Sequence, residues 1–159
     1  AVRQYRGRPF DLLIAGPGRP DEVTQAGAVR IIPAGPVTDY WTCYDDADLV
    51  VLPRRYGGLS LTAQEALASG VPVLATRREP EAAWPGVFTV PVTHRAAERM
   101  KGGPVLVESC DPRALARRLA TLVSDDGAAE LTEASKMTGW WRAAHSWEAL
   151  LPAWQEALT

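Results

Sequence analysis

The fold is decided by residues 52–73, which read LPRRYGGLSLTAQEALASGVPV. An apolar run ends at Leu52, a loop with two glycines follows, and a segment of helical period leads into a second apolar run at Val71. Gly70 stands where a helix C-cap belongs. Strand, glycine loop, helix and strand in this order form the unit from which parallel α/β sheets are built.

Short apolar runs alternate with helical segments on both sides of this unit. We expect strands at residues 11–15, 29–32, 49–52, 71–75, 87–90 and 104–107. Their continuous hydrophobicity indicates burial on both faces, and helical crossovers between such strands imply parallel pairing. The predicted fold class is α/β, a Rossmann-like, doubly wound parallel sheet with helices on both faces.

The connections carry their own start and stop signals. Helices are expected to begin at residues 20–22, at 38–39 and at Asp111, which is followed by a proline at the first helical position. Residues 4–8 are predicted to end a helix before the first strand. Helices at 112–123, 128–144 and 146–158 form a C-terminal helical tail. Residues 77–85 and 91–103, rich in charge, proline and glycine, are predicted long loops.

Composition narrows the class of protein. The chain has 159 residues, 47% of them hydrophobic, and a formal net charge of −2, which is typical of one globular domain over residues 1–159. Every apolar run is interrupted, so no membrane span is expected. The near-neutral charge makes nucleic acid an unexpected partner. Cys43 and Cys110 lie far apart without further ligands at metal spacing, which favours a reducing, cytoplasmic setting over zinc or disulfide chemistry.

The glycine loop is the candidate binding site. Free amides at Gly58, Leu59, Ser60, Leu61 and Thr62, aided by the helix dipole, suit a phosphate group. Arg54 and Arg55 could add positive charge at the end of the preceding strand. Glu65, one helical turn further on, could accept hydrogen bonds from the two vicinal hydroxyls of a ribose. On spacing alone, a plain strand-to-helix turn is an equally simple interpretation.

The stretch 53–73 resembles the signature of retaining glycosyltransferases of the GT-B fold, the group 1 or family 4-like enzymes. The likeness is to their C-terminal, nucleotide-sugar-binding domain. Residues 12–18, 32–37, 111–116 and 146–148 also resemble segments of that domain, so the likeness spans about residues 11–158. It implies that the chain is the C-terminal half of a two-domain enzyme, with the acceptor-binding N-terminal domain absent.

The resemblance also assigns residues. Glu65 matches the second glutamate of the family's paired-glutamate motif, which holds the ribose. The first glutamate, which contacts the donor sugar, would fall at Gly57, so that contact is absent. Leu59 and Ser60 stand in place of the family's phenylalanine and second glycine. The basic clamp on the diphosphate has no counterpart before Asp11.

Two further positions are implied as neighbours of the nucleobase. Pro36 and Val37, in the loop after the second strand, would flank the base if the family geometry holds, although a plain loop is an open alternative. The glycines of residues 16–18 form only part of a dinucleotide fingerprint, so no NAD site is predicted.

Other polar and aromatic residues are given structural interpretations. Asp46 and Asp48 resemble the metal motif of a different glycosyltransferase fold, but acidic residues at a helix end commonly solvate a turn, so neither a metal nor a cofactor is predicted. His94 is expected in a solvated loop and His145 at a helix end. Four tryptophans are expected to pack the terminal helices onto the sheet, or onto a domain not present: Trp140, Trp141, Trp147 and Trp154.

The predicted function is that of a glycosyltransferase donor domain, which binds a UDP- or GDP-sugar for retaining transfer without a metal. No catalytic residue is assigned, and the chain alone is expected to be inactive. Two alternatives stay open. One is a non-catalytic nucleotide-sugar-binding or interaction module; the other is half of a sugar-nucleotide epimerase, which would need an added acid/base set.

Overall fold

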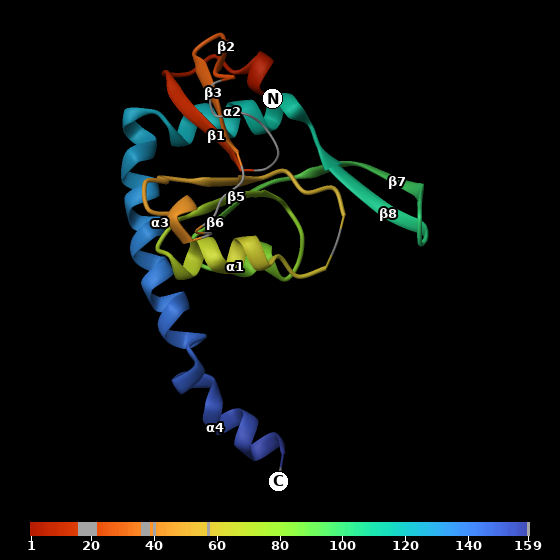
Figure 1. Cartoon of the computed structure of the whole chain (residues 1–159), viewed down its shortest axis with the longest axis vertical. Coiled ribbons are helices and arrows are strands. Elements are labelled where there is room, and N and C mark those ends of the chain that lie inside the picture. Colours follow the sequence, from red (N-terminus) through yellow and green to blue (C-terminus); the bar gives the residue numbers. More distant parts are fainter. Residues whose placement is uncertain (16–21, 36–38, 40, 57, 159) are drawn as a thin grey trace.

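The computed structural model describes residues 1–15, 22–35, 39, 41–56 and 58–158 (Figure 1). The strands are β1 (Phe10–Ala15), β2 (Thr24–Ala26), β3 (Val29–Gly35), β4 (Val50–Leu52), β5 (Val73–Thr76), β6 (Val87–Val90), β7 (Val92–Met100) and β8 (Gly103–Cys110). The α-helices are α1 (Leu61–Ala68), α2 (Pro112–Leu122), α3 (Asp125–Ala144) and α4 (Trp147–Ala157). Short 3-10 turns occur at η1 (Val2–Gln4), η2 (Trp41–Cys43) and η3 (Glu81–Ala83).

A parallel sheet of three strands, β4-β5-β6, lies at the centre. Val50 pairs with Val73, and Val73 pairs with Val87. All four residues of β5 are buried, as the continuous apolar run predicts for a strand covered on both faces. Side chains alternate along β5, so that Val73 and Ala75 enter one core cluster and Leu74 enters the other.

Helices cover both faces of this sheet. The first core cluster joins β5 to α1 through Ala66 and Leu67, and to Trp141 of α3. The second cluster joins β5 to Leu119 and Leu122 of α2. The α/β, Rossmann-like class with helices on both faces is therefore confirmed.

The N-terminal strands form a second three-stranded sheet, β1-β3-β2. The pairing of β1 with β3 is parallel, as expected, while β2 runs antiparallel to β3. Partly buried Phe10 and Ile31 pack against the second core cluster. The two sheets therefore share the second core cluster.

Two predicted helix starts differ from the structure. Pro20 and Asp21 lie outside the described residues, and the segment that follows forms β2, which turns into β3 at Gly27, where φ is +66°. Thr38 also lies outside the described residues, and the helical structure nearby is only the 3-10 turn η2. The helix end predicted at residues 4–8 is the end of the short 3-10 turn η1, which stops at Gln4 with Tyr5 as its C-cap.

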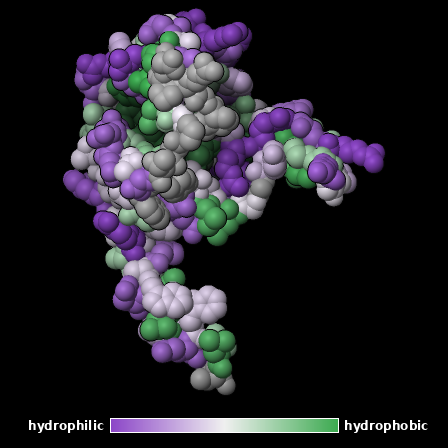
Figure 2. Space-filling model, viewed as in Figure 1, coloured by the Kyte–Doolittle hydropathy of each residue, from purple (hydrophilic) through white to green (hydrophobic). Residues whose placement is uncertain are grey.

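The prediction of a long loop over residues 91–103 is wrong. Strands β7 and β8 form an antiparallel hairpin that projects from the body (Figure 1). Residues 104–107 therefore belong to this hairpin and not to the parallel sheet. Charged side chains lie along both strands, for example Arg95 opposite Glu108, and Figure 2 shows a largely hydrophilic arm. The sequence looked loop-like because few of these side chains reach the core.

Helices α2 and α4 begin at the predicted caps, whereas α3 begins at Asp125, three residues before the predicted start, with Ser124 as its N-cap. Asp111 accepts a hydrogen bond from the amide of Arg113 (2.9 Å), and Ser146 caps α4 by accepting from Ala149 (3.2 Å). α4 has no buried residue and extends away from the sheets (Figure 1). Trp141 packs against Trp84 at 5.8 Å between ring centroids, which confirms the packing predicted for this tryptophan. The other three tryptophans of that prediction are exposed: Trp140, Trp147 and Trp154.

The two glycines of α3 offer a matched test of packing. A Cβ on Gly127 would lie 2.0 Å from the backbone oxygen of Thr121 and 2.6 Å from that of Leu122, whereas a Cβ on Gly139 would meet nothing within 4 Å. Gly127→Ala should therefore lower the free energy of unfolding by about 1–3 kcal/mol. Gly139→Ala should raise it by about 0.5–1 kcal/mol, because alanine is the better helix former. Urea denaturation measures both; equal effects would contradict the packing described.

Candidate functional site

The glycine loop leads directly into α1, as the sequence predicts. Ser60 is the N-cap, and its Oγ accepts a hydrogen bond from the amide of Ala63 (3.2 Å). Leu61 and Thr62, which begin the helix, donate from their amides to no acceptor among the described residues, as is usual for the first turn of a helix. A Cβ on Gly58 would meet nothing within 4 Å, so the outer side of the loop is open.

Arg54 reaches the glycine loop, but not as a free cation. Its Nη2 donates to the carbonyl of Gly58 (2.8 Å), and its Nη1 forms an ion pair with Glu81 (3.4 Å). Arg55 forms an ion pair with Glu98 of β7 at the exposed surface. The carbonyl of Arg55 also accepts from the amide of Glu108 (2.7 Å), which ties the base of the hairpin to this edge of the sheet.

Glu81 was missed by the sequence reasoning. This residue begins η3 after β5 and is only 8% exposed. Its Oε1 accepts a hydrogen bond from the amide of Ser60 at 2.9 Å. The carboxyl ends of neighbouring parallel strands meet at one edge of a sheet. The position of an acidic residue shortly after the predicted strand β5 was therefore the signal by which the sequence could have placed Glu81 near the glycine loop.

Glu65 lies in α1 one turn beyond the loop and is half-buried. Its Oε2 accepts a hydrogen bond from the hydroxyl of Tyr44 at 3.3 Å. Tyr44 follows η2 and is itself buried. The structure therefore places the carboxylate of Glu65 in contact with a side chain that the sequence reasoning did not single out.

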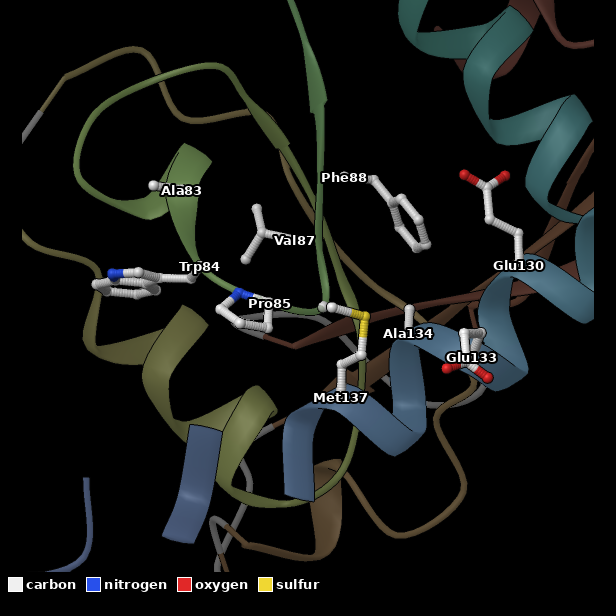
Figure 3. A pocket seen from close by; sticks show the side chains of 10 residues that line it. Ala83, Trp84, Pro85, Val87, Phe88, Glu130, Glu133, Ala134 and Met137 are labelled. Atoms are coloured by element: carbon white, nitrogen blue, oxygen red, sulfur yellow. The ribbon is translucent and has the colours of Figure 1, made fainter. Parts of the chain in front are cut away.

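A cavity of about 20 Å³ lies under the loop, with Arg54, Ser60, Thr76, Arg78 and Glu81 in its lining. That volume suits a single water molecule. A much larger cavity, of about 580 Å³, lies between the 83–88 segment and α3 (Figure 3). Trp84, Phe88 and Met137 contribute to it, and none of the predicted donor-binding residues does.

Several predicted positions cannot be compared with the structure. Gly57, the proposed nucleobase neighbours Pro36 and Val37, and the glycines of residues 16–18 lie outside the described residues. Across the part of the chain that is described, no group of three His, Cys, Asp or Glu side chains gathers as metal ligands.

The histidines occupy different settings. His145 is the C-cap of α3, as predicted, with its Nδ1 2.8 Å from the carbonyl of Trp141 and its ring stacked on that indole. His94 is exposed, but it lies on β7 instead of in a loop.

Comparison with known protein families identifies the class. The family model described as "Glycosyl transferases group 1" matches residues 1–125, and the chain belongs to this family. The match covers the strand, glycine loop and helix that form the candidate site. No solved structure shows a significant match.

Curated relatives carry glycosyltransferase names. The chain is 31% identical, over 138 residues, to a D-inositol 3-phosphate glycosyltransferase of Corynebacterium urealyticum, an alignment that covers 79% of this chain and 30% of the relative. It is 46% identical, over 57 residues, to a lipopolysaccharide core biosynthesis mannosyltransferase of Rhizobium meliloti, and that alignment covers 35% of this chain and 16% of the relative. The chain thus spans less than a third of the length of these relatives. Of the helices described, none has both the length and the apolar character needed to cross a bilayer.

The N-cap of α1 can be tested against the N-cap of α4. Ser60→Ala removes the hydrogen bond to Ala63 and should lower the free energy of unfolding by about 1 kcal/mol. Ser146→Ala removes the equivalent bond in a helix without buried residues, so global unfolding should change by no more than about 0.5 kcal/mol. Urea denaturation followed by tryptophan fluorescence and circular dichroism measures both. If Ser60→Ala left stability unchanged, the capping role would be wrong.

Proposed function

We propose that this chain is the donor-binding domain of a glycosyltransferase that uses a UDP- or GDP-sugar with retention of configuration. One observation carries the proposal. A capped glycine loop opens α1 with its first-turn amides unpaired among the described residues, and Glu65 follows one turn later. Family membership supports this interpretation over a plain strand-to-helix turn.

The proposed binding mode begins with the phosphates. The amides of Leu61 and Thr62 donate to the diphosphate, with Gly58, Leu59 and Ser60 shaping the approach. The positive end of the α1 dipole favours negative charge at this position, and it would stabilise the departing nucleoside diphosphate in the same way. Because Arg54 and Arg55 are both paired with carboxylates, we assign the main phosphate contacts to amides and not to these side chains.

Glu65 is proposed to hold the ribose. A carboxylate accepts two hydrogen bonds, so it can bind vicinal hydroxyls together. Contact with the Tyr44 hydroxyl limits the freedom of Glu65. Pro36 and Val37 remain the proposed neighbours of the base, and Gly57 supplies no carboxylate to the sugar.

The acceptor site is proposed to lie in an N-terminal domain outside these 159 residues, because the curated relatives are more than three times as long as the matched segment. The exposed apolar residues of the α4 region support a contact with such a domain: Trp147, Leu150, Leu151, Trp154 and Leu158. Residues 1–159 would then act as one Rossmann-like domain that is inactive alone. A metal-independent reaction in the cytoplasm remains our expectation, and both cysteines are free thiols.

A non-catalytic nucleotide-sugar-binding module is a second candidate. The neutralised arginines and the glycine at position 57 favour it, since both reduce direct contacts with the diphosphate and the sugar. Sugar transfer by the chain combined with its N-terminal half would support the enzyme. Nucleotide binding without transfer in that combination would support the module.

Glu65→Ala should weaken binding of UDP or GDP by about 1–3 kcal/mol, because hydrogen bonds to a charged acceptor are lost. Isothermal titration calorimetry measures this, with the neighbouring Gln64→Ala as the control. The 2′,3′-dideoxy nucleotides lack the ribose hydroxyls, so wild type should bind them more weakly than the ribonucleotides. Wild type and Glu65→Ala should bind these dideoxy nucleotides with equal affinity. Unchanged affinity for the ribonucleotides in Glu65→Ala would refute the ribose assignment.

A further inference from the structure

Glu81 is a buried acid beside the glycine loop. Its carboxylate lies at the carboxyl edge of β4 and β5, where it helps to line the small cavity together with apolar Leu52 and Val73. Removing a carboxylate from water costs several kcal/mol unless the charge is paired and hydrogen-bonded. The partners of Glu81 therefore determine whether this residue is tolerated and what it does.

Those partners close a ring around the loop. Glu81 accepts from the amide of Ser60 (2.9 Å) and pairs with Arg54 (3.4 Å), while Arg54 donates to the carbonyl of Gly58 (2.8 Å). Only Leu59 lies between the two loop residues that the ring holds. Two side chains from the ends of neighbouring strands thus fix the path of the backbone into α1.

The ring also divides the hydrogen-bond donors in and beside the glycine loop into two groups. The Ser60 amide and two nitrogens of Arg54 are engaged on the protein side. The next amides, those of Leu61 and Thr62, have no acceptor among the described residues, and the side chains of Leu59 and Leu61 are exposed. The engaged groups support the loop, and the amides of Leu61 and Thr62 are left for a ligand.

We propose that Glu81 is a positioning residue for the donor loop: it holds residues 58–60 so that the first-turn amides of α1 meet the diphosphate of the donor. This inference rests on the function proposed above. It assigns Glu81 no contact with the donor, and it makes Arg54 a support for the loop instead of a phosphate ligand.

A competing role for Glu81 would have the opposite effect on diphosphate binding. The N-terminus of a helix stabilises anions, so the carboxylate of Glu81 beside α1 could compete with a phosphate for this position. Neutralising it would then strengthen diphosphate binding. Positioning is favoured by the burial of Glu81 and by its two partners, because displacement would leave both the Ser60 amide and Arg54 without this acceptor.

The binding experiment compares Glu81→Gln with Glu98→Gln. Glu98 is the exposed partner of Arg55, so it is the matched control. Calorimetry gives the Kd of UDP and GDP and of the parent nucleosides. Glu81→Gln should weaken diphosphate binding about tenfold and leave nucleoside binding unchanged. Glu98→Gln should alter neither by more than about twofold. If Glu81 had a purely structural role, Glu81→Gln would weaken nucleoside binding as much as diphosphate binding, and the proposal would be overturned. Unchanged or stronger diphosphate binding in Glu81→Gln would also overturn it.

Amide hydrogen exchange of the ligand-free chain tests the positioning directly. The Ser60 amide should be protected in wild type and in Glu98→Gln and lose protection in Glu81→Ala; retained protection would overturn the proposal. Should Glu81→Gln fail to fold, Arg54→Met/Glu81→Gln removes both charges together, which buried pairs tolerate better than loss of one partner, and it should show the same loss of diphosphate affinity. If wild type binds no nucleotide, the proposed function fails, and the exchange of Ser60 still decides whether Glu81 holds the loop.

Discussion

Burial of β5 from both sides is the constraint on which the rest of the structure depends. Val73 and Leu74 are completely buried, yet they face different core clusters. Fully burying a valine or leucine side chain contributes about 1.5–3 kcal/mol, so α1 on one face and α2 on the other are both held by this one short strand. The flanking strands β4 and β6 pair with β5 in parallel and take their places from it.

The same constraint assembles the candidate site. Parallel pairing brings the chain that leaves β4 close to the chain that leaves β5, although Arg54 and Glu81 are 27 residues apart in sequence. The partly buried ion pair of Arg54 and Glu81 then couples the glycine loop to the sheet edge. Glu108 pairs with Arg95 within the hairpin (2.8 Å) and with Arg78 after β5 (3.5 Å), and the second pair anchors the hairpin to the same edge. The arginines near the site are thus balanced by carboxylates from three separate segments of the chain.

The parts of the fold that sequence reasoning predicted are those with local causes. Apolar runs marked β1, β3, β4, β5 and β6, and the caps Asp111 and Ser146 marked the starts of α2 and α4. The errors fell where burial is weak. β2 has no buried residue, and the β7–β8 hairpin is held chiefly by pairing between its own strands, which a run of charged residues does not reveal. Likewise, Glu81 looked like a loop residue because nothing local shows that its charge is buried.

The α/β class, the glycine loop that opens α1 and the family of the chain can all be predicted from the sequence, because each depends on local periodicity, turn chemistry or a contiguous motif. Which charged side chains are paired with one another depends on the tertiary structure. The packing of the chain pairs Arg54 with Glu81 and Arg55 with Glu98, and it brings the Tyr44 hydroxyl to Glu65. Those pairings join segments from different strands and helices. They follow from how the elements pack around β5, which no local stretch of sequence contains.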